Sequence, residues 1–460
     1  MNYSEAREYL KNVNKLGSIL GLNTIKELLK RLGNPQNELK VVHIAGTNGK
    51  GSIMTFVQNI LMESGYKVGR YCSPAVFNER EIIRINDEYI SEEQSADLLT
   101  RIKEKCDSMY SEGLPHPTSF EIETAEALMF FKEQNCDIAL IECGMGGETD
   151  ATNVFEKVLC SVIATISLDH TQFLGSTIEE ITKVKSGIIK ENCPVVMSKQ
   201  IVEAESVIKK VCKQNNSKLI IPTEQDSENV EIDGLTTKVT YKASNNKEYI
   251  LNLQALGTYQ IKNAKTAVEV ALVLDKALTE KTNICDESDK NNGTGMKNNI
   301  NNSGNTIEKN IKKGIEKTVW PGRMEVISKE PLIIIDGAHN PGAVLELRKT
   351  LDLYFTNKRI TFIMGVLSDK DFSKEAEIIA DRAERIITIT PNNSRGLDGH
   401  KLAETLVKYN HNVQVADSLK QAAEESIDTM KENRADMILA FGSLSYLGEL
   451  KQVVRLICNH

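Results

Sequence analysis

The stretch Gly46-Thr47-Asn48-Gly49-Lys50-Gly51-Ser52 decides the fold, because it follows an apolar run at 39–45 and precedes a helix-like segment. Glycine lets backbone N–H groups turn toward an anion without a Cβ clash, and a helix N-terminus adds the positive end of its dipole. Lys50 adds a full positive charge. A strand, a glycine loop and a helix in this order predict a phosphate site in an α/β domain.

The spacing of this loop departs from the common Walker pattern. Ile44 stands where that pattern has its first glycine, and Gly51 separates Lys50 from the hydroxyl group of Ser52. The alternative is a glycine-rich surface turn that contains a lysine by chance. The order of strand, loop and helix favours the phosphate site.

Length and charge limit the possible classes of protein. A chain of 460 residues exceeds what one hydrophobic core usually supports, so two or three domains are expected. The net charge of −8 provides no basic field for nucleic acid. No signal peptide and no long uncharged apolar run are present, so we expect a soluble cytoplasmic protein that does not bind a membrane. Nine cysteines without a C-x-x-C pair predict reduced core residues, and the scattered histidines disfavour zinc.

The rest of the sequence alternates short β-branched runs with helical patterns that are long enough for crossover connections. This alternation predicts the α/β class with parallel sheets. Between 230 and 253, apolar and polar residues alternate around a turn at Asn245-Asn246, which predicts a small antiparallel appendage. The other expected strands lie at 41–45, 67–72, 138–143, 159–166 and 194–197, and at 332–335, 360–366, 385–390 and 436–441.

A polar segment divides the chain into two α/β domains. Residues 289–310 are rich in Asn, Gly and Lys and offer little to bury, so we expect a mobile surface insertion there. The larger domain is expected at 1–288 and the smaller at 311–460, with a linker near 311–323.

Two of the predicted strands end in side chains that can bind a divalent cation. Glu142 precedes the glycines at 144–147, and His170 follows Asp169. Ligands of doubly wound sheets bind at the carboxyl ends of strands, where phosphate needs a divalent cation, so magnesium binding is the natural role of Glu142. The alternatives are a glutamate that begins an exposed loop and a histidine with structural hydrogen bonds.

The following helical segment, 177–190, contains a lysine within its apolar stripe. At about 100° per residue the isoleucines of this segment share one face, and Lys185 lies among them. A buried lysine needs a partner or a chemical role. The alternative is a side chain that extends along the apolar surface to reach water at the helix end.

The second domain repeats the pattern of apolar strand, acidic tip, glycine and helix start. Its residues are Leu332-Ile333-Ile334-Ile335-Asp336-Gly337-Ala338-His339-Asn340-Pro341, and proline suits the first helical turn. Arg323 precedes them in Trp320-Pro321-Gly322-Arg323. Its guanidinium group could bind a phosphate, and a surface arginine is the alternative.

Together these segments resemble the folylpolyglutamate synthase and dihydrofolate synthase family, a branch of the Mur ligase superfamily, over nearly the whole chain. The unusual glycine loop matches this family better than the Walker pattern. One departure is Tyr259, because the family often has histidine before Gln260. The resemblance rests on 46–52, Ser73-Pro74, Asn78-Glu79-Arg80, Glu142, 144–147, 149–153, 168–171, Leu174-Gly175, 185–188, 260–263, 320–323 and 336–341.

The resemblance implies a Mur-type P-loop ATPase domain and a smaller Rossmann-like C-terminal domain, with ATP in the cleft between them. It implies catalytic roles for Lys50, Lys185 and His170, a carbamylated Lys185, and Mg²⁺ bound by Ser73, Glu142 and His170. A free lysine is neutral only about once in a few thousand molecules at pH 7, so burial would favour carbamylation. The implied ATP-binding residues are Thr47, Asn48, Gly49, Lys50, Gly51, Ser52, Asn263, Arg323, Asp336 and His339, and the glutamate-site candidates are Asp336, His339 and Ser443.

The implied reaction is ATP-dependent ligation of L-glutamate to a folate carboxylate through an acyl phosphate. Folate or dihydropteroate, L-glutamate and ATP are the expected partners of a monomeric enzyme. Gln172 stands where enzymes that also accept dihydropteroate often carry aspartate, so dihydrofolate synthase activity stays open. The alternatives are a Mur-type ligase for a cell-wall precursor and a non-catalytic nucleotide-binding homologue.

Overall fold

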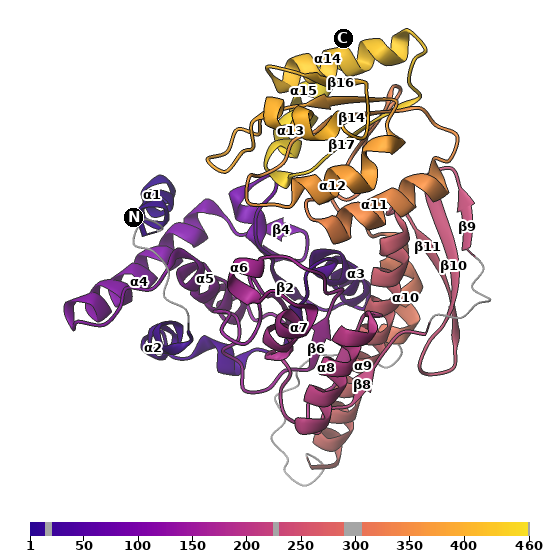
Figure 1. The fold of residues 1–460 in the computed structure, drawn as a ribbon. Coiled ribbons are helices and arrows are strands. Elements are labelled where there is room, and N and C mark those ends of the chain that lie inside the picture. The colour runs from indigo at the N-terminus through magenta and orange to yellow at the C-terminus, as the bar shows by residue number, and fades with distance from the viewer. Residues whose placement is uncertain (14–20, 224–229, 289–305, 459–460) are drawn as a thin grey trace. The chain divides into compact units, whose positions relative to one another are not determined.

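A computed structural model describes residues 1–13, 21–223, 230–288 and 306–458, without the side chains of 280–288. Contacts divide the chain into two compact units (Figure 1). Unit 1 comprises 1–229, 240–251 and 262–317, and unit 2 comprises 230–239, 252–261 and 318–460. Helix α9 (Thr258–Ser288) begins in unit 2 and continues in unit 1.

Unit 1 is built on an eight-stranded sheet with the order β4-β3-β2-β5-β1-β6-β7-β8. Strands β2, β5, β1, β6, β7 and β8 pair in parallel, and β3 and β4 add an antiparallel edge next to β2. Every residue of β1 and β5 is buried, as expected of parallel strands with helices on both faces. The strands are β1 (Val41–Ala45), β2 (Val68–Tyr71), β3 (Ile83–Ile85), β4 (Glu88–Tyr89), β5 (Ile138–Glu142), β6 (Cys160–Ile163), β7 (Val195–Met197) and β8 (Leu219–Ile220).

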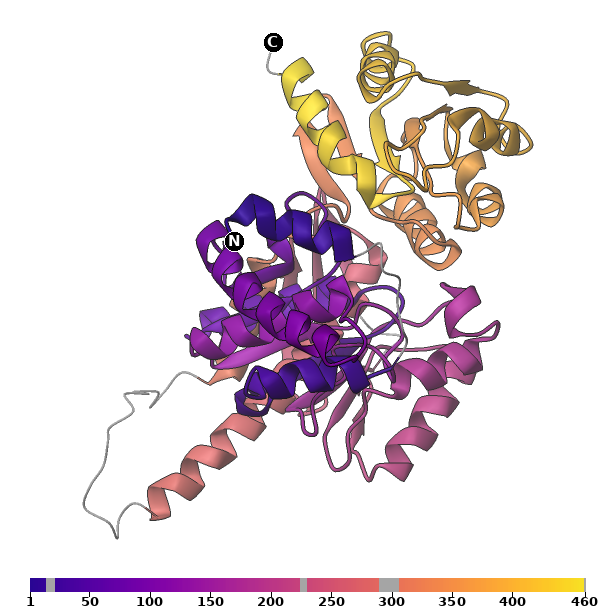
Figure 2. The same cartoon turned by 90° about the vertical axis from the view of Figure 1, so that its left-hand side faces the viewer.

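The helices of unit 1 cover this sheet with apolar faces. One core cluster joins α1, α2, α4 and α5 to β1, β2 and β5, and Figure 2 shows α1 lying beside α4. A second cluster joins α7 and α8 to the ends of β6 and β7. The helices are α1 (Tyr3–Val13), α2 (Asn23–Arg31), α3 (Lys50–Glu63), α4 (Glu92–Ser111), α5 (Ser119–Glu133), α6 (Thr171–Leu174), α7 (Ile178–Ser186), α8 (Val202–Gln214) and α10 (Ile307–Glu316).

The antiparallel appendage predicted between 230 and 253 is confirmed. Its three strands have the order β11-β10-β9, and β10 alternates between buried and more exposed residues. Asn246, in the predicted turn, adopts a left-handed φ of 63°, which asparagine tolerates. The strands are β9 (Val230–Asp233), β10 (Thr236–Lys242) and β11 (Glu248–Leu253).

Unit 2 contains a six-stranded sheet with the order β12-β13-β17-β14-β15-β16 (Figure 1). Only the edge strand β12 is antiparallel, so the predicted second α/β domain with a parallel sheet is confirmed. Its strands are β12 (Glu325–Lys329), β13 (Leu332–Ile335), β14 (Ile360–Met364), β15 (Arg385–Thr388), β16 (Val413–Val415) and β17 (Met437–Phe441). Its helices are α11 (Pro341–Tyr354), α12 (Phe372–Ile379), α13 (Gly399–Leu406), α14 (Leu419–Lys431) and α15 (Leu444–Cys458).

Two details differ from the sequence-based expectations. Helix α7 ends at Ser186 rather than near 190, and its C-cap residue, Gly187, lies close to the backbone of Glu148. The last residues of the expected insertion, 307–310, belong to α10, which packs on α3 and buries Ile307 and Ile311. The remainder, 289–305, lies outside the described residues.

The boundary between the units and the state of the cysteines can also be compared with the predictions. Unit 2 resumes at Thr318, inside the expected linker, and it also takes in 230–239 and 252–261. The eight cysteines with described side chains are all free thiols, and five of them are buried. Cys458 is exposed, so for this residue the expectation of a core position is wrong.

Candidate active site

The glycine loop joins the end of β1 to the start of α3, as its sequence predicts. Thr47 and Asn48 donate their backbone N–H groups to the Thr165 carbonyl at 2.8 and 3.0 Å, which fixes the loop to the chain that follows β6. Gly49 has a φ of 91°, and a Cβ there would lie 2.6 Å from Asn263 Oδ1. Glycine is therefore required at 49 by the backbone and by the neighbouring helix α9.

Two lysines meet at one carbonyl group of this loop. Lys50 Nζ donates to Gly46 O at 3.2 Å and to Thr47 O at 3.3 Å, and Lys185 Nζ donates to the same Gly46 O at 3.0 Å. The sequence predicted a role for each lysine, whereas their common acceptor is visible only in the structure. The arrangement concentrates positive charge at the mouth of the loop, where an anion would bind.

Lys185 is buried as the apolar stripe predicted, with 5% of its surface exposed. Burial and, secondarily, the charge of Lys50 lower the pKa of Lys185 to about 8. The alternative of a side chain that reaches water does not describe this residue. A substantial fraction of Lys185 is thus neutral near physiological pH, which makes the amine a nucleophile.

Glu142 lies at the carboxyl end of β5 and pairs with Lys50, with 3.6 Å between Oε1 and Nζ. Side chains alternate along a strand, and Ala139 and Ile141 pack into the core cluster of α5, so Glu142 faces the opposite side, where α3 begins. The residue is 5% exposed, so the alternative of an exposed loop residue is wrong.

Cys72 is a contact of this site that the sequence did not reveal. Its thiol donates to Glu142 Oε2 at 2.6 Å. Burial and the neighbouring carboxylate raise the pKa of the Cys72 thiol well above its usual range, so the residue remains a donor. Its position directly before Ser73 at a strand end was the available signal, but the cysteine was assigned only to the core.

The loop after β5 positions Lys185 through close backbone packing. A Cβ on Gly147 would lie 2.7 Å from the Lys185 carbonyl oxygen, so only glycine allows this approach. Asn153 donates its side-chain amide to Glu148 O at 3.0 Å and to Gly187 O at 3.1 Å. The loop and the end of α7 therefore form one rigid frame around Lys185.

Ser73 and His170 follow β2 and β6, so together with Glu142 they occupy the carboxyl ends of nearby strands in one sheet. His170 has a left-handed φ of 50° at the start of α6, and its side chain is 41% exposed. Within the described ranges, no group of three or more His, Cys, Asp or Glu is arranged to hold a metal. A Mg²⁺ ion here would depend on one carboxylate, the serine hydroxyl, water and phosphate oxygens, a donor set that this ion accepts.

The predicted residues of unit 2 gather at the ends of β13 and β17, which pair in parallel. Asp336 is 2% exposed, and its carboxylate accepts hydrogen bonds from Ala338 N and Met324 N, both at 2.8 Å. Ser443 follows β17 and is also buried. A Cβ on Gly337 would overlap the Arg323 guanidinium group, so Arg323 lies directly across this glycine.

The imidazole of His339 has a defined proton position. Its Nδ1 lies 2.7 Å from Gly337 O, and because a carbonyl only accepts, Nδ1 carries the hydrogen. Nε2 is therefore the acceptor nitrogen of the neutral ring and the site of a second proton. The structure thus describes two sets of predicted residues, one in each unit.

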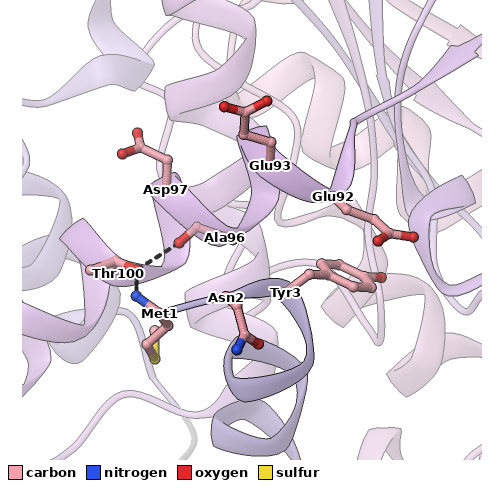
Figure 3. A pocket seen from close by; sticks show the side chains of 8 residues that line it. All are labelled: Met1, Asn2, Tyr3, Glu92, Glu93, Ala96, Asp97 and Thr100. Atoms are coloured by element: carbon pink, nitrogen blue, oxygen red, sulfur yellow. Dashed lines mark hydrogen bonds between the residues drawn. The ribbon is translucent and has the colours of Figure 1, made fainter.

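A pocket on unit 1 does not coincide with either set. It lies at the start of α1 and α4, where the Met1 amine donates to Thr100 Oγ1 at 2.8 Å (Figure 3). Three carboxylates line it, those of Glu92, Glu93 and Asp97, and no lysine or arginine among the described residues does. Such a lining repels phosphate, so we do not assign this pocket to the nucleotide.

Comparison with known proteins identifies the family. The family model of the Mur ligase middle domain matches residues 44–271, and that of the Mur ligase glutamate ligase domain matches residues 322–444. A dihydrofolate synthase/folylpolyglutamate synthase of Bacillus subtilis is 30% identical over 464 residues, which cover 98% of each chain.

The chain belongs to the folylpolyglutamate synthase and dihydrofolate synthase family.

Solved structures of this family share the fold along the full length. The folylpolyglutamate synthase of Thermotoga maritima is 32% identical, with a TM-score of 0.77 and coverage of 98% of this chain and 96% of that one. An FPGS complex with AMPPCP and folate is 28% identical, with a TM-score of 0.80 and coverage of 99% and 100%.

Family membership makes the chain an ATP-dependent ligase with the Mur ligase fold, as the resemblance implied. The roles of individual site residues stay predictions. None of the helices in the described parts of the chain combines the length and the apolar character that crossing a bilayer requires.

Proposed function

We propose that this enzyme ligates L-glutamate to a carboxylate of a folate at the expense of ATP. The observation that carries the proposal is the convergence of Lys50 and Lys185 on Gly46 O, with Glu142 beside Lys50. Two cations and one carboxylate at the N-terminus of a helix suit a nucleotide phosphate and its counter-ion. The folate and AMPPCP in a related complex support the choice of substrates.

The reaction consists of two balanced steps. The folate carboxylate attacks the γ-phosphorus of ATP, and ADP leaves with the electrons of the broken bond. The amine of glutamate then attacks the acyl carbon, an amide forms, phosphate leaves and the amine releases a proton. No protein nucleophile is needed, so the enzyme contributes positioning and electrostatic stabilisation.

Lys50 and the loop 46–52 hold the phosphates in this proposal. The N–H groups at the start of α3 and the Lys50 ammonium group would neutralise charge that develops on the transferred phosphoryl group. Asn263, in contact with Gly49, would line the nucleotide site from α9.

Ser73, Glu142 and His170 would hold Mg²⁺. The Glu142 carboxylate beside Lys50 and the serine hydroxyl at a nearby strand end provide oxygen donors, so the residues present suit this ion. When bound, the metal would neutralise phosphate charge and orient the oxygens of the transferred group.

Lys185 is proposed to carry a carbamate. The ammonium group would first lose one proton; the neutral amine would then attack CO2, forming the N–C bond and releasing a second proton, so that the side chain changes overall from a cation to an anion. The lowered pKa supports this step, because only the neutral amine reacts. His170 would act near the same phosphates.

The residues of unit 2 are proposed to bind nucleotide and glutamate. Arg323, Asp336 and His339 would contact ATP, and Asp336 and His339 would also border the glutamate site with Ser443. In this assignment residues 1–288 form the ATPase and folate domain, and 311–460 form the glutamate domain. We expect a monomeric, cytoplasmic enzyme.

Phosphate release tests the proposal. ATP, Mg²⁺ and glutamate are supplied with tetrahydrofolate, with dihydropteroate or with a UDP-muramoyl precursor. We expect glutamate-dependent release with tetrahydrofolate, and a dihydropteroate signal would establish the second activity. Lys50→Met should abolish release, whereas Lys199→Met, at a lysine whose side chain is 46% exposed, should not.

Two results would contradict the proposal. Release that requires the UDP-muramoyl precursor would indicate a cell-wall ligase. Release that is independent of every acceptor, or no release at all, would indicate a nucleotide-binding protein without ligase activity.

A further inference from the structure

Tyr259 makes a contact in unit 2 that the family resemblance does not explain, since the family often has histidine at this position. Its hydroxyl donates to Asp336 Oδ2 at 2.7 Å. Tyr259 lies in the first turn of α9, directly after Thr258. The contact joins this helix to the acidic tip of β13.

The hydrogen bond completes a set of donors around a buried carboxylate. Asp336 Oδ1 accepts from Ala338 N, and Oδ2 accepts from both Met324 N and Tyr259 OH. A buried carboxylate is costly unless such donors satisfy its oxygens. Tyr259 is the only side-chain hydroxyl group in this set among the described residues.

The same carboxylate stabilises the turn that carries Arg323. Met324 has a φ of 45°, a left-handed conformation that L-residues rarely adopt, and its N–H is held by Asp336. Gly337 N donates to Gly322 O at 2.8 Å from the other side of the turn. A shift of the Asp336 carboxylate would therefore release the turn and move the Arg323 guanidinium group.

The charges around Asp336 make the tyrosine hydroxyl important for its ionisation. Burial raises the pKa of Asp336, while Arg323, Tyr259 and the two backbone N–H groups oppose this rise. Burial and the adjacent Asp336 raise the pKa of Tyr259 well above its usual range, and Glu346 acts in the same direction while Arg323 opposes it. Tyr259 thus remains a protonated donor at every physiological pH.

We propose that Tyr259 is a positioning residue, which holds the Asp336 carboxylate in place and thereby fixes the turn that presents Arg323. The inference rests on the proposed function, in which Asp336 and Arg323 serve the nucleotide. Tyr259 itself is not a catalytic residue, because it acts through Asp336.

A double-mutant cycle tests the contact without any activity. Melting temperatures are measured for the wild type, Tyr259→Phe, Asp336→Asn and the double variant. The amide that Asp336→Asn introduces is neutral, so its hydrogen bond with the hydroxyl is weaker. The drop in melting temperature caused by Tyr259→Phe should therefore be smaller in Asp336→Asn than in the wild type, by a factor of about two or more. Additive shifts would overturn the proposal, because they would mean that the two side chains do not interact.

Kinetics test the positioning role against a matched control. Tyr259→Phe should lower kcat by about tenfold to a hundredfold, the factor that loss of a hydrogen bond to a charged group gives. The KM for folate should stay within about twofold. Tyr354→Phe removes a comparable hydroxyl of unit 2, bonded to Thr237 at 2.6 Å, and should affect only stability. Tyr259→His should restore most of kcat, because it restores a donor.

The pH profile separates positioning from general destabilisation. Without the hydroxyl the ionised form of Asp336 loses a donor, so its pKa rises and the acidic limb of kcat should move to higher pH in Tyr259→Phe. A kcat and a pH profile equal to those of Tyr354→Phe would overturn the proposal. If the wild type releases no glutamate-dependent phosphate, the proposed function fails, and the thermal cycle still decides whether Tyr259 holds Asp336.

Discussion

The lowered pKa of Lys185 leads to a quantitative prediction about its chemistry. At pH 7.4 an ordinary lysine is neutral in about one molecule in 1,300, whereas a pKa of about 8 makes about one in five neutral. The reactive form is thus enriched by about 250-fold. Enzyme in buffer with ¹³C-bicarbonate should show a carbamate signal in ¹³C NMR that is absent from Lys185→Ala.

Activity should follow the carbamate. Lys185→Ala should lose phosphate release, and short carboxylates such as acetate should restore part of it, because they can replace the missing anion. Lys183→Ala is the matched control, since Lys183 lies on the same helix but is exposed. Unchanged activity of Lys185→Ala, or a carbamate signal that persists in it, would refute the assignment.

The pH dependence of stability, measured without CO2, tests the lowered pKa of Lys185 independently of the carbamate. The pKa of Lys185 is about 8 when folded and near 10.5 when unfolded, so between these values the unfolded chain binds more protons and stability rises with pH. Below pH 8 the full cost of the buried charge, about 3 kcal/mol, is present. Lys185→Met should therefore be more stable than the wild type at pH 7, and this gain should vanish toward pH 10.5. A constant difference across this range would contradict the pKa.

The remaining predictions concern the glycine loop and the metal. Gly49→Ala should abolish nucleotide binding and lower the free energy of unfolding by about 1–3 kcal/mol, because alanine is strained at a φ of 91° and meets Asn263. Gly65→Ala is the control, because Gly65 has a φ of 86° and open space around its Cβ position, so this variant measures the cost of backbone strain alone. Equal losses of unfolding free energy in the two variants would show that contact with Asn263 is irrelevant. Glu142→Gln should raise the Mg²⁺ concentration for half-maximal phosphate release by about tenfold or more. The control, Glu148→Gln, changes an exposed loop residue and should leave this concentration unchanged. An equal Mg²⁺ requirement in both variants would exclude Glu142 as a ligand.

Much of the fold could be predicted because its strands are short continuous apolar runs. Val41–Ala45 and Leu332–Ile335 have the predicted bounds, and the ends of the others differ by a few residues. Helix α7 was predicted too long, because the isoleucines after Ser186 continue the apolar pattern beyond the last helical turn. They are buried in the same core cluster without being helical. Periodicity reports burial, and it does not report where backbone hydrogen bonds stop.

The site was predicted in its components but not in its contacts. Glycines, a lysine and an acidic strand tip are local signals, so Lys50, Glu142 and Asp336 could be found from the sequence. Cys72 offers only its position at a strand end, and Tyr259 offers no local signal, because their roles come from partners 70 and 77 residues away. A hydroxyl or thiol becomes specific only through the carboxylate that it contacts.

The sequence by itself determined the α/β class, the family and the loop that is predicted to bind phosphate, since each depends on residues that are adjacent along the chain. Only the tertiary structure decided that Lys50 and Lys185 share Gly46 O, and that burial lowers the pKa of Lys185 to about 8. The strand order β2-β5-β1-β6 brings the carboxyl ends of strands that are distant in sequence to the same end of the sheet. Charge interactions depend on distance and on exclusion of water, and the fold sets both.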